Sequence, residues 1–163
     1  MPSNAFMKLG EIKGNSRDEF HKDWVVVELA TLPVHRTLPE GQSGERRGRG
    51  APTLGNVLVT RQLDKSSPPL LLACLHGAGF DFVELHFCTQ IEGRARPYLK
   101  IKLGDVILQS YNVTAQAGPH APIPTENISL NYASIEYTFV ELNDQTGQVR
   151  NQIMAAYDIG SAR

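Results

Sequence analysis

The sequence predicts a mainly β protein: an antiparallel β-barrel of two packed sheets with about seven or eight strands, one flanking short α-helix at about 67–76 and a long extended loop at about 36–53. Two observations lead to this fold class. Apolar and polar residues alternate over several short runs separated by turn residues, as in antiparallel strands with one buried face. A convincing helix signal occurs once, between residues 57 and 77.

The first third of the chain predicts two strands and then a long loop. Residues 5–13 are expected as the first strand, which ends at the turn 14–16, and residues 24–31 as the second. The stretch 36–53 contains four glycines, two prolines and almost no apolar residue. Loops of this length inside a compact domain are usually functional or disordered.

Residues 57–77 predict a strand that leads directly into the helix. Val57, Val59 and Leu63 share one alternation phase, which fits a strand. Residues suited to an N-cap and a first helical turn follow: Asp64, Ser66, Ser67, Pro68 and Pro69. The run 70–75 is almost wholly apolar and Gly77 suits a C-terminal cap, so we expect a single buried helix.

The clearest strand pattern lies in the middle of the chain. Residues 83–91 and 99–103 alternate cleanly, and the turn residues 93–97 predict that the two runs form a hairpin. Residues 106–113 are expected as a further strand, with less regular alternation.

The last part predicts a loop at 115–125, a long strand at 127–141 and a closing strand at 149–159. The apolar phase flips between Tyr132 and Ile135. A flip of this kind indicates either a β-bulge or a strand that bends from one sheet into another, and the sequence leaves both open.

Length and composition narrow the classes of protein to which the chain can belong. The length of 163 residues suits one domain, so 1–163 is expected to be a single unit. The charges of the 16 basic and 17 acidic side chains nearly cancel, so the net charge does not predict electrostatic attraction to nucleic acid or anionic lipid. Neither a secretory signal nor a membrane span is expected. Cys74 and Cys88 are interpreted as core thiols of a chain that folds in a reducing compartment, and a disulfide or a reactive thiol is the less favoured alternative.

No catalytic, cofactor-binding or metal-ligating constellation is expected. None of the five histidines pairs with another at a metal-ligand spacing. His86 and Glu84 form a possible base and orienting carboxylate, but alternation alone places polar residues there, so a solvated polar face is favoured. His76 is expected to interact with the helix carbonyls. A hydrolase that uses His86 or His120 is kept as a hypothesis.

Two features suggest binding. The Arg-Arg-Gly-Arg-Gly run at 46–50 fits a phosphate-tracking segment, a solvated loop or a loop that docks on a protein surface, and composition favours the solvated loop. A small-ligand or glycan-binding β-barrel without enzymatic activity is the alternative function. This alternative is motivated by four tyrosines that could share a binding surface, although core or interface positions are favoured for them: Tyr98, Tyr111, Tyr132 and Tyr137.

Several blocks of the chain, taken in order, resemble one family. The segment 58–74, Leu-Val-Thr-Arg-Gln-Leu-Asp-Lys-Ser-Ser-Pro-Pro-Leu-Leu-Leu-Ala-Cys, resembles the strand-to-helix passage of the haemolysin-coregulated proteins, Hcp. The blocks 6–16, 103–108 and 126–137 are similar to it as well. Ordered matches over several blocks are more specific than any single motif, and the likeness is weakest at 34–53 and after residue 141.

The resemblance implies a non-enzymatic subunit of the type VI secretion inner tube, without a cofactor. It implies a β-barrel protomer, a homo-hexameric ring, stacked rings and export through the system without a signal peptide after assembly in the cytoplasm. The implied partners are the contractile sheath, the spike-tip protein and effectors held in the ring lumen, with no nucleic acid and no membrane insertion. The loop 36–53 would contact the adjacent ring, and Arg46, Arg47 and Arg49 would be its stacking residues.

Overall fold

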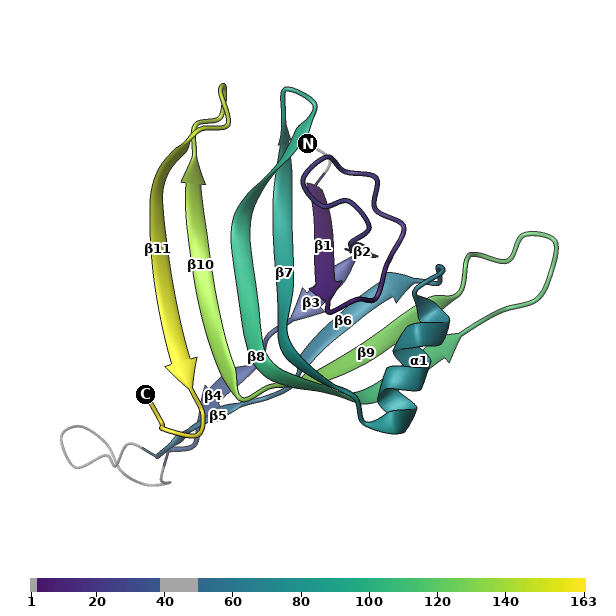
Figure 1. The fold of residues 1–163 in the computed structure, drawn as a ribbon, viewed down its shortest axis with the longest axis horizontal. Coiled ribbons are helices and arrows are strands. Elements are labelled where there is room, and N and C mark those ends of the chain that lie inside the picture. The colour runs from purple at the N-terminus through teal and green to yellow at the C-terminus, as the bar shows by residue number, and fades with distance from the viewer. Residues whose placement is uncertain (1–2, 39–49) are drawn as a thin grey trace.

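The computed structural model describes residues 3–38 and 50–163, and most of these residues are in β-strands (Figure 1). The elements follow in chain order: β1 (Ser3–Leu9), β2 (Val25–Val27), β3 (Leu29–Thr31), β4 (Val34–Arg36), β5 (Pro52–Leu54), β6 (Val57–Gln62), α1 (Ser67–His76), β7 (Gly79–Ile91), β8 (Arg94–Thr114), β9 (Thr125–Asn131), β10 (Ser134–Leu142) and β11 (Val149–Asp158). The predicted mainly β class with one short helix is confirmed within this part of the chain.

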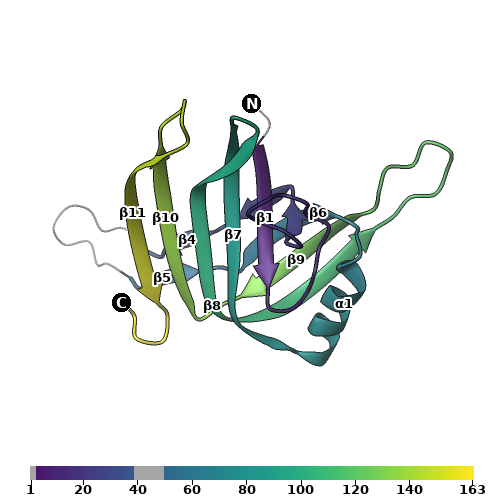
Figure 2. The ribbon, with the colours of Figure 1, turned by 45° about the horizontal axis from the view of Figure 1, so that its top comes forward.

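Strands β1–β3 and β6–β11 form a curled antiparallel sheet of two layers, without a closed barrel, and β4 and β5 form a separate two-stranded sheet (Figure 2). The hydrogen-bonded order is β2-β1-β7-β8-β9-β6-β3, and β10 joins β8 on the side that leads to β11. The two end strands, β2 and β3, are consecutive in the chain. They are separated by Glu28, whose backbone N–H donates to Thr60 at 2.9 Å. The expected second strand at 24–31 is therefore two short strands that pair with different layers.

Strand β8 runs through both layers and bends between them. Its first half pairs with β10 and its second half with β9, while β7 follows it along most of its length. The bend lies at Gly104 and Asp105, where Asp105 has a φ of 51°. The expected separate strands at 99–103 and 106–113 are thus one strand. The preceding turn consists of Glu92 and Gly93, both with positive φ, instead of the predicted 93–97.

The phase flip between Tyr132 and Ile135 marks the point where the chain changes layers. Strand β9 ends at Asn131 and β10 begins at Ser134, opposite the bend of β8. The backbone N–H of Ala133 donates to Gly104 at 2.9 Å across this break. Of the two interpretations of the flip, the bend from one sheet into another is the one that the structure shows.

The space between the layers holds the hydrophobic core. Fully buried side chains from both layers meet there, among them Met7, Leu9, Leu85, Leu103, Ile128 and Leu130. These residues occupy alternate positions of their strands, because successive side chains of a strand point to opposite faces. The alternation in the sequence therefore identified the core face correctly.

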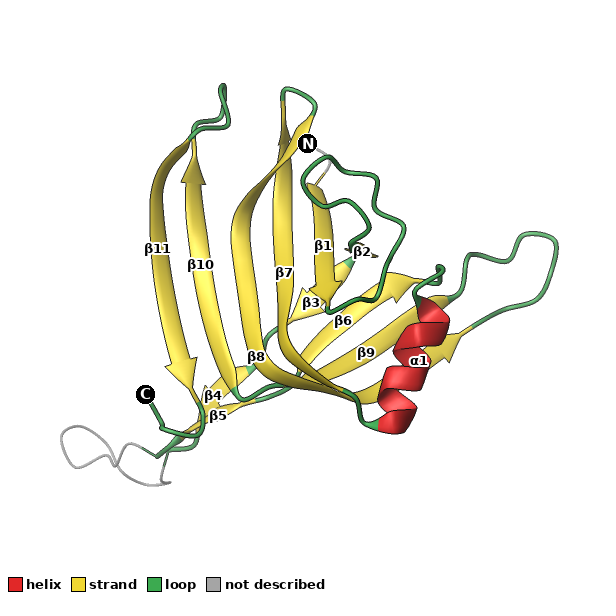
Figure 3. Ribbon diagram, in the orientation of Figure 1, coloured by secondary structure: helices red, strands yellow, loops and turns green. Residues whose placement is uncertain are grey.

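Helix α1 has the predicted bounds but not the predicted burial or N-cap. It lies at one end of the molecule (Figure 3), with Leu70 and Ala73 turned inward and Leu71, Leu72 and Leu75 exposed. Ser66 makes no capping hydrogen bond with its side chain. Gly77 takes the left-handed conformation at φ 62°, and the N–H of Ala78 donates to Ala73 at 3.0 Å, so the predicted C-cap is confirmed. No helix among the described residues is long and apolar enough to cross a membrane.

Candidate assembly surfaces

The β10–β11 hairpin carries an apolar face that starts in the core and ends in solvent. Ile135 at its start is 7% exposed, whereas Phe139, four residues on, is 47% exposed. Ile153 of β11 is the register partner of Phe139. Tyr137, Phe139 and Ile153 are named the hairpin face below. Large apolar and aromatic side chains that extend a core face into solvent are typical of protein interfaces.

An apolar hollow of about 360 Å³ lies where the hairpin meets the paired strands β4 and β5. Val34, Pro52 and Leu54 line it from these strands, and Tyr137 and Tyr157 line it from the hairpin. The ends of the predicted 36–53 loop are thus a two-stranded arm that packs beside the hairpin. The sequence interpretation of 36–53 as loop throughout was wrong at these ends.

A second apolar surface lies on the outer side of α1. Leu71, Leu72 and Leu75 are all exposed there, and Leu75 is the most exposed at 69%. These three side chains are named the helix face below. Figure 1 shows that α1 and the β10–β11 hairpin lie at opposite ends of the long axis of the described residues. The protein therefore presents two different apolar surfaces on elements at opposite ends of its long axis.

A buried polar network fixes the start of α1. Arg61 of β6 and Glu126 of β9 are fully buried and face each other, with 2.5 Å between Nη1 and Oε2. Arg61 Nη2 also lies 2.5 Å from Asp64 Oδ1, and the hydroxyl of Tyr111 donates to Glu126 Oε1 at 2.5 Å. Buried charges of this kind are retained when they are paired and hydrogen-bonded. The network ties β6, β8 and β9 to the turn that precedes the helix.

Two pKa shifts follow from this network. Burial opposes the ionisation of Asp64, but hydrogen bonds from Ser66 and the Arg61 guanidinium outweigh it and lower the pKa of Asp64. Burial and the hydrogen bond to Glu126 raise the pKa of Tyr111 to about 12. At neutral pH the network therefore contains a charged Asp64 and a neutral Tyr111, which suits a structural joint.

The histidine and tyrosine hypotheses have mixed outcomes. His86 lies 3.3 Å from Glu84, as their positions on one face of a strand predict. The prediction that His86 lies on a solvated polar face is wrong, because its side chain is largely buried beside His21 and Trp24. Burial, with the charges of His21 and Lys100, lowers the pKa of His86 to about 4. His120 is exposed in the loop between β8 and β9.

The tyrosines that motivated a ligand-binding barrel do not gather on one surface. Tyr132 is buried in the core, Tyr111 belongs to the polar network and Tyr137 lies on the hairpin face. The structure gives these three side chains different surroundings, in line with the favoured core and interface positions.

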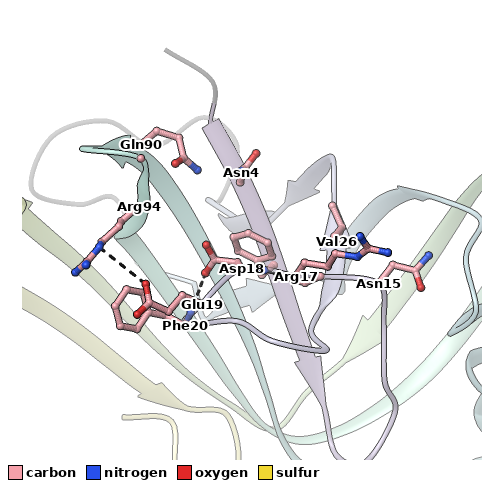
Figure 4. Close-up of a pocket in the computed structure, with 12 residues that line it drawn as sticks. Asn4, Asn15, Arg17, Asp18, Glu19, Phe20, Val26, Gln90 and Arg94 are labelled. Carbon is pink, nitrogen blue, oxygen red and sulfur yellow. Dashed lines mark hydrogen bonds and ion pairs between the residues drawn. The ribbon is translucent and has the colours of Figure 1, made fainter.

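A polar hollow of about 580 Å³ opens beside β1 and the segment 15–20 (Figure 4). Charges of both signs line it, including Arg17, Asp18, Glu19 and Arg94. Glu19 and Arg94 are 3.9 Å apart and mostly exposed, so this pair contributes little. Within 3–38 and 50–163, no group of three or more His, Cys, Asp or Glu side chains is arranged to hold a metal ion.

The remaining residues singled out in the sequence are three arginines and two cysteines. Arg46, Arg47 and Arg49 fall outside the described residues, so their role remains a prediction. Cys74 and Cys88 are free thiols. Burial, together with the Asp18 carboxylate, raises the pKa of Cys88 to about 12, which keeps this thiol protonated.

Taken together, fold and surfaces define a class: a curled antiparallel β protein with one helix at its end and two uncovered apolar surfaces. The family model described as "Type VI secretion system effector, Hcp" matches residues 6–139, most of the chain. The chain belongs to this family, the Hcp proteins of the type VI secretion system.

Individual relatives agree with this assignment. Protein hcp1 of Pseudomonas aeruginosa is 27% identical over 139 residues, which cover 85% of this chain and 84% of the relative. A solved structure of a type six secretion system protein matches with a TM-score of 0.84 at 23% identity, over 99% of both chains. Hcp1 from Salmonella typhimurium matches with a TM-score of 0.78 at 21% identity, over 100% of this chain and 99% of the other.

Sequence reasoning missed the buried network and the helix face. Arg61 and Glu126 each stand in a strand, and pairing them requires knowing that β6 and β9 are neighbours with Arg61 opposite Glu126. A usable signal was present, because both occupy the alternation phase of buried residues in their strands. The sequence does not predict the helix face, because an apolar run alone does not distinguish full burial of a helix from burial of one side.

Proposed function

We propose that this protein is the structural subunit of a type VI secretion inner tube and forms hexameric rings that stack. The observation that carries the proposal is the pair of unlike apolar surfaces at opposite ends of the molecule, the hairpin face and the helix face. When two different patches of one chain contact each other in successive copies, the contact is heterologous, and it closes into a ring if the rotation allows. The number six comes from the resemblance to the family.

The chemistry of the two surfaces supports such a contact. Aromatic and aliphatic side chains on the hairpin face would meet leucines on the helix face, and neither set carries a charge that burial would penalise. The near-balance of 16 basic and 17 acidic residues limits repulsion among many copies in one assembly.

Stacking is assigned to the arm formed by β4 and β5. This arm brings residues 36 and 52 together by antiparallel pairing. We place Arg46, Arg47 and Arg49 at the contact with the next ring, where guanidinium groups would meet carboxylates. Effectors in the lumen, the sheath and the spike-tip protein complete the proposed partners of a tube that leaves the cell through this system.

A matched pair of substitutions on β11 tests the ring contact. Ile153 lies on the hairpin face and is 63% exposed, whereas its neighbour Met154 points to the opposite face of the hairpin and is 61% exposed. We expect Ile153→Asp to abolish rings in negative-stain images, because it places a charge in an apolar contact. Met154→Asp, with the same new charge, is expected to keep the rings.

Two results would contradict the proposal. One is a wild-type protein without rings under any condition in which it is folded. The other is equal behaviour of the two aspartate variants, which would show that the hairpin face is not the contact.

A further inference from the structure

Strands β2 and β6 border an open seam in the curled sheet. The hydrogen-bonded order of the described strands ends at β2, and β6 pairs with β3 and β9 but not with β2. One backbone hydrogen bond closes the seam at one end, where the N–H of Glu28 donates to the C=O of Thr60 at 2.9 Å. Next to this bond lies a hollow of about 250 Å³, which Val26 and Glu28 line from one side and Gln62 from the other.

The backbone N–H and C=O of Val26 point into the seam. Val26 is the middle residue of β2 and pairs with β1 alone. Two residues before it, the C=O of Trp24 accepts from Ser16, and two residues after it, Glu28 donates to β6. Because the backbone groups of a strand alternate between its two sides, those of Val26 face the same side as these two. In the described part of the chain they have no hydrogen-bond partner there.

Gln62 presents a second strand edge from the opposite wall. It is the last residue of β6 and pairs with β9 alone. Thr60, two residues earlier, directs its C=O toward Glu28, so the N–H and C=O of Gln62 face the seam by the same alternation. Two edges with unpaired backbone groups therefore border one hollow. An uncovered strand edge is a template for the pairing of another chain.

Apolar side chains surround these edges. Val26, Leu63 and Ile123 are all exposed, and all three line the hollow of the seam. Val26 also lines the polar hollow of about 580 Å³ and a third hollow of about 360 Å³, so the three spaces meet at β2. In Figure 4, Val26 lies with Arg17 and Asn15 at one end of the polar hollow. Together the hollows give an elongated region that continues past the seam.

We propose that the seam between β2 and β6 binds a short extended peptide segment of a partner protein. The segment pairs with the backbone groups of Val26 and Gln62 as an added strand, and one of its apolar side chains packs against Val26, Leu63 and Ile123. An extended peptide fits this site because it carries a donor and an acceptor at every residue, at the spacing of a strand. The inference does not depend on the ring proposed above.

Amide hydrogen exchange of the free protein tests the geometry. The amides of Val26 and Gln62 are expected to exchange about tenfold or more faster than those of Val25 and Val27, whose backbone groups face β1. Protection of Val26 equal to that of Val25 would overturn the proposal, because the edge would then already be paired.

Peptides selected from a random library on phage, with the wild-type protein as target, serve as probes of binding. The selected peptides are expected to slow the exchange of the Val26 and Gln62 amides, and fluorescence anisotropy of labelled peptides measures their affinity. Val26→Pro removes the N–H at an edge position that proline tolerates, so it is expected to weaken binding about tenfold. Val26→Thr keeps the N–H and the branched shape, and this matched control should bind like the wild type.

A second variant keeps β2 unchanged. The side chain of Asn15 lines the hollow of the seam, so the indole of Asn15→Trp would occupy part of this space and is also expected to weaken binding about tenfold. Thermal unfolding shows whether Val26→Pro and Asn15→Trp are folded, and Asn15→Trp carries the test if the proline variant is not.

Three outcomes would overturn the proposal. One is a selection in which no peptide slows the exchange of Val26. Another is equal affinity of Val26→Pro and Val26→Thr for the selected peptides. The third is a folded Val26→Pro that binds the peptides like the wild type but loses its rings, which would assign the seam to a second copy of this chain. The first two outcomes are independent of whether rings form.

Discussion

At the scale of single residues, the most consequential position is Arg61. Its guanidinium is fully buried and meets the carboxylates of Glu126 and Asp64. The side chain looks like an ordinary polar residue of a strand in the sequence, because the alternation pattern reports which face is buried and says nothing of charge partners. Its role depends on the pairing of β6 with β9, which brings Arg61 opposite Glu126.

We predict that Arg61→Met lowers the free energy of unfolding by about 3–5 kcal/mol, because Glu126 would be left buried without its partner. Chemical denaturation of the purified protein measures this change. Replacing both residues, with Arg61→Met and Glu126→Leu together, is expected to recover much of the loss. Arg94→Met, which touches only an exposed ion pair, serves as the control and should change stability by less than about 1 kcal/mol. Equal losses in Arg61→Met and Arg94→Met would argue against the network.

At the scale of elements, the helix shows both the strength and the limit of sequence patterns. The prolines and Gly77 predicted the bounds of α1 correctly, because the first turn and the C-cap have local steric requirements. The apolar run did not predict burial. A helix can bury one side only, so a run that is apolar all around leaves some leucines exposed unless another element covers them.

The two sides of α1 predict opposite behaviour of two leucines. Leu70→Ala is expected to lower the free energy of unfolding by about 2–5 kcal/mol, because Leu70 is fully buried in the core. Leu75→Ala removes the same atoms from an exposed position and should leave the stability of the protomer nearly unchanged. Thermal or chemical unfolding of dissociated protein compares the two, and a loss as large for Leu75→Ala as for Leu70→Ala would show that the helix is buried on both sides.

The strand patterns predicted the strands themselves but not how they pair. The phase flip at Tyr132 to Ile135 was visible in the sequence, yet a bulge and a change of layer produce the same flip. The bend of β8 at Gly104 and Asp105 resolves it, and this bend gave no separate signal because 99–103 and 106–113 both look like complete strands. Strand identity was thus predictable, whereas the long-range pairing was not.

At the scale of the whole molecule, the family was identified from ordered blocks of sequence and is confirmed by the family model. The apolar surfaces at the two ends were not predicted, because exposure depends on which strands cover which faces. The arrangement of subunits is a proposal that rests on these surfaces and on the family.

For the stacking of rings, we predict that the triple change Arg46→Glu, Arg47→Glu and Arg49→Glu leaves single rings intact and reduces the fraction of stacked rings. The reversed charges would repel the carboxylates that the arginines are proposed to meet. Sedimentation velocity separates single from stacked rings. The matched control reverses three exposed lysines elsewhere, Lys13, Lys22 and Lys65, and equal loss of stacking in this control would assign the effect to net charge instead of to the loop.

Native mass measurement of the wild-type protein tests the proposed hexameric ring most directly. A hexamer is expected as a species of about 108 kDa, six times the 18.0 kDa chain, at micromolar concentration. A folded protein that remains a monomer of 18.0 kDa from micromolar to millimolar concentration would contradict it.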